Sequence, residues 1–309
     1  MLYPKPIRKG DCVAILSPAT EVRKEFVDGA ESFLRRRGYE VAVMPSALGP
    51  AEGSFASSLK NRLNDIESAL RDDSVKAILC ARGGYGCVHL LQHMPLQFIR
   101  EHAKWIVGFS DVSALHALWQ SAGVASVHGP MAKHLATEGD DDPCSELLMQ
   151  ILEGRPEYEV AAASSPYNRR GKGKGVLRGG NLAVLNGLAS APYYLMDLKD
   201  GEDVVLFIED ISEAIYAVER MLFRLFLSGA FGRVKGLIVG QFTEYRPDRN
   251  HGSMEEMIDS FLSRCGIEGL PVAFGFPVGH VSDNRPLIEG ARVELSVSED
   301  SSVLKVMTI

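Results

Sequence analysis

Ser110 stands at a point in this sequence where a side chain could do covalent chemistry. It directly follows the short apolar run 105–109 and precedes a segment with helical spacing, so it lies at the tip of a predicted strand-to-helix turn. Such a turn holds a hydroxyl away from the backbone, beside the N–H groups of the helix start, as attack on a carbonyl carbon requires. Alternatively, Ser110 only caps a helix predicted over 111–120, because Val112 replaces the last glycine of G-x-S-x-G.

Two titratable residues follow predicted buried strands in the second half of the chain. Glu209 follows the run 203–208, and His280 follows the run 272–276 after a short turn. Taken singly, Glu209 could be an ion-pair partner or an anion at a helix start, and His280 an ordinary loop histidine. Together with Ser110 they supply a hydroxyl, a base for its proton and a carboxylate that holds the tautomer of the base, which are the parts of nucleophilic acyl transfer.

A glycine-rich turn, Gly83-Gly84-Tyr85-Gly86, follows the strand predicted over 76–80. It could cradle a phosphate, but it lacks the Lys-Ser/Thr of a P-loop and the spacing of G-x-G-x-x-G. Alternatively, the N–H of Gly84 lies beside that of Asp111, and both stabilise a developing oxyanion. A third possibility is that the glycines have only a structural role, in a tight turn whose backbone needs positive φ.

Candidate substrate-binding residues stand in two glycine-containing turns. A substrate carboxylate is usually recognised by a cation or by unused backbone N–H groups. Arg82 and Arg178 are the candidate cations, and Tyr85 and Asn181 in the same turns complete the set. Both arginines could instead be surface cations. The eight histidines include no H-E-x-x-H motif, so we expect no metal and no other cofactor.

The elements that must position these residues alternate between strand and helix. In the first half, short apolar runs at 12–16, 39–44, 76–80, 105–109 and 124–128 are separated by helical segments such as 22–37 and 59–71. This alternation predicts βαβ units and a mostly parallel sheet, with function at the carboxyl ends of the strands. The polar, aperiodic stretch 161–174 predicts a linker, which gives an N-terminal α/β domain over 1–160 and a C-terminal domain over 175–309.

The bulk composition excludes several classes of protein. The 309 residues are 46% hydrophobic and 24% charged, and the net charge of −7 argues against nucleic-acid binding. No run approaches 18 apolar residues, so we expect no membrane span, and the N-terminus makes a poor signal peptide. Five cysteines without a C-x-x-C pair suggest buried thiols in a reducing compartment, so we expect a cytoplasmic protein.

Six short motifs, in order along nearly the whole chain, resemble one known family. They are ARGGYG (81–86), GFSD (108–111), HGPM (128–131), RGGNL (178–182), LFIED (206–210) and FPVGH (276–280), and the segment DNRPLIEGARVEL also fits. With these motifs the sequence resembles the LD-carboxypeptidases of peptidase family S66, the murein tetrapeptide carboxypeptidases, and the related microcin C immunity peptidases.

The resemblance implies a fold, a site and a reaction. The fold is α/β, with a parallel-sheet N-terminal domain and a β-rich mixed C-terminal domain, in a protein that is usually a homodimer. Ser110, Glu209 and His280 would form a triad, and the amides of Gly84 and Asp111 an oxyanion hole. The implied reaction is hydrolysis, without metal, of the L,D bond to the terminal D-alanine of cytoplasmic peptidoglycan tetrapeptides during recycling. Two alternatives stay open: a peptidyl-nucleotide hydrolase of the microcin C type, and a non-catalytic nucleotide-binding module.

Overall fold

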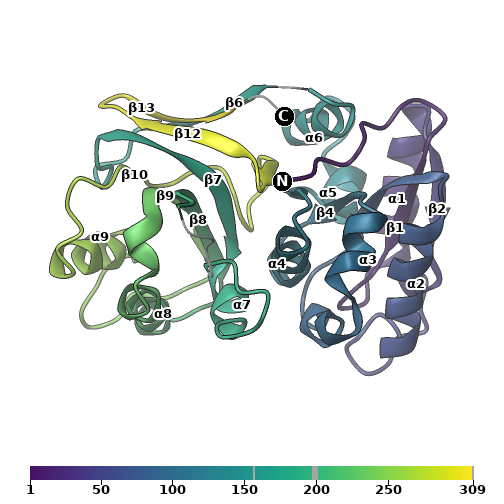
Figure 1. Cartoon of the computed structure of the whole chain (residues 1–309), viewed down its shortest axis with the longest axis horizontal. Helices are drawn as coiled ribbons and strands as arrows, with labels where there is room; N and C mark the ends of the chain where they lie inside the picture. The colour runs from purple at the N-terminus through teal and green to yellow at the C-terminus, as the bar shows by residue number, and fades with distance from the viewer. Residues whose placement is uncertain (156, 197–200, 308–309) are drawn as a thin grey trace. The chain divides into compact units, whose positions relative to one another are not determined.

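The chain divides into two compact units. The computed structural model describes residues 1–155, 157–196 and 201–307 (Figure 1). The first unit comprises Met1–Pro156 and Asn284–Glu289, and the second comprises Glu157–Asp283 and Gly290–Ile309. The expected domains, 1–160 and 175–309, differ from these units mainly in two places, the stretch 161–174 and the segment 284–289.

The first unit is built from strands that alternate with helices, as the apolar runs predicted. Its elements are β1 (Cys12–Leu16), α1 (Lys24–Arg36), β2 (Glu40–Val43), η1 (Pro45–Ala47), α2 (Leu59–Arg71), β3 (Val75–Cys80), η2 (Cys87–His89), η3 (Leu91–His93), α3 (Leu96–Glu101), β4 (Trp105–Gly108), η4 (Ser110–Val112), α4 (Ser113–Ser121), β5 (Ser126–His128), α5 (Ala132–Thr137), α6 (Pro143–Leu152) and β11 (Leu287–Glu289).

The first sheet is parallel except at one edge. Its strand order is β11-β5-β4-β3-β1-β2, and only the pairing of β11 with β5 is antiparallel. The central strands β3 and β4 are almost wholly buried, which explains why they are continuous apolar runs in the sequence. The parallel sheet of βαβ units is therefore confirmed, and the turns after β3 and β4 lie at the carboxyl ends of neighbouring strands.

Strand β11 returns to the first unit from the far end of the sequence. Leu287 pairs with His128 and Glu289 with Ser126. A Cβ on Gly129 would lie 2.9 Å from the Cβ of Pro286, so a glycine at this position allows the incoming segment to approach closely. The sequence did not predict this strand, because three residues, of which only Leu287 and Ile288 are apolar, are too few to show a period.

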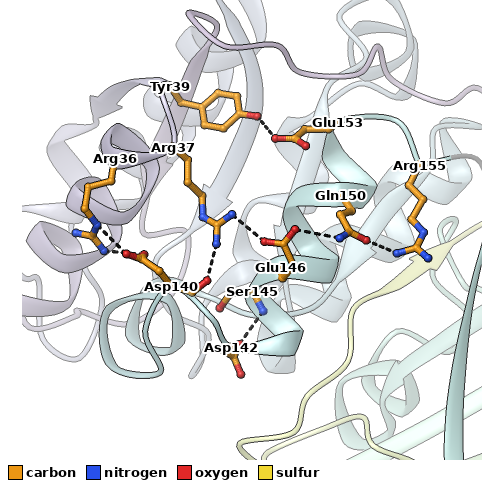
Figure 2. Close-up of polar contacts among 10 residues, drawn as sticks. All are labelled: Arg36, Arg37, Tyr39, Asp140, Asp142, Ser145, Glu146, Gln150, Glu153 and Arg155. Carbon is orange, nitrogen blue, oxygen red and sulfur yellow. Dashed lines mark hydrogen bonds and ion pairs between the residues drawn. The ribbon is translucent and has the colours of Figure 1, made fainter.

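Charged side chains connect α6 and the segment before it to the end of α1. Arg36 pairs with Asp140 at 2.8 Å, and Arg37 pairs with Glu146 at 2.9 Å (Figure 2). The α6 helix begins with a capped first turn, because Asp142 accepts the N–H of Ser145 at 2.7 Å. These contacts tie the last helix of the first unit to its first helix.

The second unit combines parallel and antiparallel pairing. Its elements are β6 (Tyr158–Ala163), β7 (Gly171–Asn181), α7 (Leu182–Gly187), β8 (Val204–Ile211), α8 (Ile215–Leu227), η5 (Ala230–Arg233), β9 (Val234–Thr243), α9 (Met254–Arg264), β10 (Val272–Ala273), β12 (Arg292–Val297) and β13 (Ser301–Val306).

The second sheet has the order β10-β9-β8-β7-β12-β13-β6. Strands β7 to β10 run parallel, whereas β12, β13 and β6 pair antiparallel (Figure 1), which confirms a mixed sheet. The tail strands expected at 291–296 and 303–308 correspond to β12 and β13, except that residue 308 lies outside the described residues. Helices α8 and α9 pack on β8 and β9 to form an apolar core.

The stretch 161–174, expected to be a linker, instead contains the end of β6 and the start of β7. Glycine occurs here because neighbouring backbone segments leave no room for a side chain. A Cβ on Gly173 would lie 1.8 Å from the carbonyl oxygen of Lys235, and one on Gly175, just after the stretch, would lie 2.6 Å from that of Asp203. Small residues here therefore reflect close backbone contact rather than a flexible connection.

Among the described residues, none of the helices is long and apolar enough to cross a lipid bilayer.

Candidate active site

Ser110 lies on a strained turn between β4 and α4. Its φ is +64°, a left-handed conformation that side chains other than glycine rarely adopt. Ser190, Ser212 and Glu244 share this property, so strain alone does not identify a nucleophile. The turn does, however, have the sharp strand-to-helix geometry that presents a serine hydroxyl in hydrolases.

The capping interpretation of Ser110 has no hydrogen bond to support it. Neither η4 nor α4 has a side-chain cap at its start. Elsewhere in the chain, four helices do have a side-chain cap that accepts the N–H three residues ahead. The capping residues of α2, α6, α7 and α9 are Ser58, Asp142, Asn181 and Ser253. Ser110 thus differs from the side chains that do cap helices in this protein.

The glycine turn after β3 meets the turn that carries Ser110. A Cβ on Gly83 would lie 2.9 Å from the Cβ of Ser110 and 3.2 Å from the nitrogen of Asp111. Gly84 has a φ of +105°, and a Cβ there would lie 2.2 Å from Oγ1 of Thr20. Both the space and the backbone conformation therefore favour glycine in this turn.

Two backbone N–H groups at this meeting point are available for a ligand. Across the described ranges, neither the N–H of Gly84 nor that of Asp111 has a hydrogen-bond acceptor within the protein. The rest of the glycine turn is well bonded. Thr20 donates its N–H to the carbonyl of Gly83 at 3.2 Å, and its Oγ1 accepts the N–H of Tyr85 at 3.1 Å.

Arg62 also holds the glycine turn in place. Its side chain is buried, and Nη1 donates to the carbonyls of Pro18 at 2.8 Å and Gly86 at 3.1 Å. The guanidinium also lies 4.9 Å from the ring centre of Phe55. A buried cation with these acceptors fixes the carboxyl ends of β1 and β3 relative to each other.

Glu209 and His280 form a bonded pair in the second unit. Glu209 is fully buried in β8, and its Oε2 lies 2.8 Å from Nδ1 of His280, whose side chain is 16% exposed. A carboxylate can only accept, so Nδ1 carries the proton, and Nε2 is the basic nitrogen in this tautomer. This arrangement suits a histidine that takes a proton from a hydroxyl.

Gly279 allows this pair to form. Its φ is +124°, and a Cβ there would lie 3.0 Å from the Cβ of Glu209 and 3.1 Å from Oε2 of the same residue. Gly279 also bridges to Gln241 at the end of β9. The glycine before His280 is therefore required both for the turn and for the approach of the carboxylate.

Asp210 is a buried carboxylate beside Glu209 that the sequence-based reasoning did not select. It accepts the N–H groups of Ile211 at 2.9 Å and Ala183 at 2.8 Å, and the side-chain amide of Asn181 at 2.8 Å. Burial, together with the nearby charge of Glu209, raises the pKa of Asp210 to about 6 despite these hydrogen bonds. In the sequence, Asp210 could have been noticed because two adjacent carboxylates, Glu209 and Asp210, follow the apolar run of β8.

Three of the four candidate substrate-binding residues already have protein partners. Arg178 is 9% exposed, and it donates to the carbonyl of Leu195 at 2.9 Å and to Glu202 at 2.6 Å. The Asn181 side chain caps α7 as well as bonding Asp210. Arg82 is exposed and donates to the carbonyl of Glu21 at 2.9 Å.

Tyr85 is the aromatic candidate, and it is strongly exposed. Its ring is 56% exposed beside the glycine turn. The ring centres of Phe55 and His89 lie 6.1 and 5.3 Å away, so Tyr85 belongs to a small aromatic cluster. An exposed ring of this kind can stack on a flat or apolar ligand group.

His116, which the sequence-based reasoning also passed over, is buried behind the Ser110 turn. Its Nε2 lies 2.9 Å from the carbonyl of Gly108, and its Nδ1 lies 2.9 Å from Oγ of Ser126. Burial lowers the pKa of His116 to about 4, so it is neutral near pH 7. It therefore connects α4 to the end of β4 and to the start of β5.

Two groups of described residues have the side-chain types and spacing that can hold a metal ion. The first is His116, His128 and Glu289, and the second is His134, Asp142 and Cys144. Both ring nitrogens of His116 already have partners, and His134 Nε2 lies 2.8 Å from Asp142 Oδ2, which also accepts the N–H of Ser145. In these groups, His116, His134 and Asp142 therefore already have hydrogen-bond partners within the protein.

Comparison with known proteins identifies the family. Residues 13–129 match the LD-carboxypeptidase N-terminal domain of peptidase family S66, and residues 174–295 match the C-terminal domain of the same family. The chain is 31% identical over 307 residues to the probable murein peptide carboxypeptidase of Bacillus subtilis, a match that covers 98% of this chain and 94% of that protein.

Solved structures agree with this assignment. The crystal structure of muramoyltetrapeptide carboxypeptidase from Oxalobacter formigenes is 28% identical, with a TM-score of 0.83 over 96% of this chain and 98% of that one. An MccF-like protein from Bacillus anthracis, 23% identical with a TM-score of 0.86 over the whole of both chains, shares the fold. The chain belongs to the LD-carboxypeptidases of peptidase family S66.

Proposed function

We propose that this protein is a serine-type LD-carboxypeptidase that removes the terminal D-alanine from murein tetrapeptides. Ser110 is the nucleophile, His280 is its general base and Glu209 holds the histidine. The N–H groups of Gly84 and Asp111 receive the oxyanion. Family membership supports a peptidase that acts on murein peptides, whereas the roles of these residues are our assignment.

In the proposed reaction, Ser110 Oγ attacks the carbonyl carbon of the L,D bond while its proton passes to Nε2 of His280. Glu209 stabilises the resulting imidazolium, and the two amides stabilise the negative oxygen. The same proton then goes to the leaving amine, so D-alanine departs and a serine ester remains. Water then attacks the ester carbonyl while His280 takes its proton. His280 returns this proton to Ser110 Oγ as the ester bond breaks, which releases the shortened peptide and restores the enzyme.

The observation that carries this proposal is the Glu209–His280 pair. The fully buried carboxylate of Glu209 lies 2.8 Å from Nδ1 of His280 and so fixes the tautomer whose Nε2 is basic. Neither residue alone would have this effect. The left-handed turn of Ser110 and the two unbonded amides are the matching features in the first unit. The proposal requires that the two units bring these groups together during catalysis.

Replacement of Ser110 by alanine tests the nucleophile. We expect turnover of a murein tetrapeptide to fall by at least roughly 10³-fold, with the fold intact by circular dichroism. A fluorophosphonate should add covalently to Ser110 in the native enzyme, as intact-protein and peptide mass spectrometry would show. Ser121→Ala, which alters an exposed serine at the end of α4, is the matched control and should keep full activity. Native-level turnover by Ser110→Ala would refute the assignment.

A second candidate function is hydrolysis of a peptidyl-nucleotide. The exposed ring of Tyr85 beside the glycine turn favours it, because recognition of a nucleobase usually includes stacking on an aromatic side chain. Parallel assays with a murein tetrapeptide and an aminoacyl-sulfamoyl adenylate would separate the two. We expect faster hydrolysis of the tetrapeptide, and Tyr85→Ala should affect the adenylate more strongly.

We further propose that the enzyme works in the cytoplasm as a homodimer. The cytoplasm is where recycled tetrapeptides would meet the enzyme, and the homodimer is the assembly that the family resemblance implies. Light scattering coupled to size-exclusion chromatography measures the mass in solution. A mass near that of one 309-residue chain across micromolar concentrations would rule out the dimer.

A further inference from the structure

The side chain of Asp111 faces the glycine turn rather than solvent. It is 4% exposed, and its Oδ2 accepts the N–H of Cys87 at 2.8 Å. Cys87 directly follows Gly86, the last residue of the glycine turn. A carboxylate on the residue after Ser110 therefore bonds the backbone that continues the neighbouring turn.

We propose that Asp111 is a positioning residue whose carboxylate sets the separation of the two oxyanion donors. Its own N–H is one donor of the proposed oxyanion hole, and its side chain anchors the segment that carries the other donor, Gly84. This inference rests on the proposed function, because it concerns the amides that would receive the oxyanion.

The geometry around the turn explains why this one hydrogen bond matters. Thr20 anchors the beginning of the glycine turn through Gly83 and Tyr85, and Arg62 holds the carbonyl of Gly86. These contacts connect the turn to β1 and α2. The hydrogen bond from the Cys87 N–H to the Asp111 carboxylate connects the turn to the loop that carries Ser110.

The close packing of the two turns adds to this effect. Gly83 leaves no room for a Cβ beside Ser110 and the nitrogen of Asp111. The turns are therefore in van der Waals contact, and loss of the Asp111 carboxylate would let the glycine turn shift against its neighbour. Oxyanion donors act only within about 2.7–3.1 Å of the developing charge, so a small shift weakens them.

The test compares two replacements of Asp111. Alanine removes the acceptor for the Cys87 N–H, whereas the side-chain oxygen of asparagine can still accept it. We expect Asp111→Ala to lower kcat on a murein tetrapeptide by about 10–100-fold with KM changed by less than about threefold. Asp111→Asn should restore kcat to within about threefold of the native value.

A tetrahedral inhibitor separates positioning from simple destabilisation. A peptide phosphinate mimics the charged intermediate, so its Ki should rise in Asp111→Ala by the same factor as kcat/KM falls. Binding of the intact tetrapeptide, whose scissile carbonyl is uncharged, should stay unchanged, as its dissociation constant in a Ser110→Ala background would show. A merely structural role would weaken both ligands or neither.

Asp65→Ala is the matched control. Asp65 is also a buried aspartate of the first unit, 5% exposed, and it accepts one backbone N–H, that of Ser46 at 2.6 Å. This variant loses a hydrogen bond of the same kind in a different loop, so we expect its kcat to stay within about threefold of native.

The outcomes distinguish this inference from the proposed function. If Ser110→Ala is inactive while Asp111→Ala turns over at the native rate, the positioning role is wrong and the nucleophile stands. If Asp111→Asn is as impaired as Asp111→Ala although both are folded, the acceptor role is also wrong. If Ser110→Ala keeps native activity, the proposed function itself fails.

Discussion

The first unit holds Ser110 through its backbone, whereas the second unit holds His280 through a side chain. Ser110 owes its position to a left-handed φ of +64° and to glycines that let two turns touch. His280 owes its orientation to a buried carboxylate 2.8 Å away. The first arrangement is set by sterics and the second by electrostatics.

This difference teaches where each unit is vulnerable. A steric arrangement tolerates changes of charge but not of volume, so its critical positions are glycines. An electrostatic arrangement depends on the identity of a few polar atoms, so an isosteric change of charge is enough to disturb it. The following predictions test this contrast, from the largest expected effect to the smallest.

Removal of the Glu209 charge should have the largest effect. In Glu209→Gln the amide can donate to Nδ1 of His280, which favours the tautomer with its proton on Nε2. We expect kcat to fall by about 10³–10⁴-fold, as comparable changes do in other triads. Steady-state kinetics on a murein tetrapeptide would measure it. The control is Glu299→Gln, which alters an exposed pair with Arg170 and should be neutral. A loss below tenfold in Glu209→Gln would contradict an electrostatic role.

Added methyl groups should disturb both units by an intermediate amount, for different reasons. Gly83→Ala forces contacts of 2.9 Å with Ser110 Cβ and 3.1 Å with the Phe109 carbonyl, and we expect kcat to fall by about 10–100-fold. Gly279→Ala adds strain at a φ of +124° and crowds Glu209, so we expect about 1–3 kcal/mol less stability as well as lower activity.

The control for these variants is Gly232→Ala, since a Cβ there meets nothing within 4 Å and φ is not positive. Kinetics and urea unfolding on all three proteins would complete the comparison. Native activity in Gly83→Ala would show that contact between the turns is not needed.

One buried group in each unit, His116 and Asp210, should make opposite contributions to the change of stability with pH. Burial lowers the pKa of His116 to about 4 from 6.5, so the unfolded chain binds its proton more tightly. This contribution to stability is complete above about pH 6.5 and is lost as the pH falls towards 4, by about 3 kcal/mol. The pKa of Asp210 is raised by burial to about 6 from 3.8, so its contribution runs the other way: stability is lost as the pH rises from about 4 to 6.

Urea unfolding of the native protein, His116→Gln and Asp210→Asn between pH 4 and 7.5 would measure both effects. The difference between native protein and His116→Gln should shrink as the pH falls, and the difference between native protein and Asp210→Asn should change with the opposite slope. Parallel pH profiles for all three proteins would contradict both pKa assignments.

Much of the fold was predictable because the relevant signals are local. The apolar run of β1 and the helical spacing of α2 gave their boundaries without error, and Gly38 has the positive φ expected at a helix end. The class of fold follows from the alternation of such elements. Ser110, Glu209 and His280 were selected for the same reason, since each follows an apolar run. Glu209 and His280 do form a hydrogen bond, whereas the roles of all three residues stay a prediction.

What the sequence did not reveal depends on contacts between distant segments. The alternating Tyr158–Ala163 strand looked irregular because three of its six residues are alanines, which mark neither face clearly. The glycines of β7 suggested a flexible linker, although close backbone contact explains them. The roles of Asp210 and His116 depend on partners from other elements, so composition and spacing could not show them.

Because β11 belongs to the first sheet but follows most of the second unit in the sequence, the first sheet is completed only after most of the second unit has been synthesised. Leu287–Glu289 adds the edge strand beside β5, and Glu289 accepts a hydrogen bond from Gln120 of α4. A ribosome makes this segment only after the second unit is almost complete. The Ser110 loop is therefore made before the second unit, but the sheet beneath it gains its edge strand only after most of the second unit has been made.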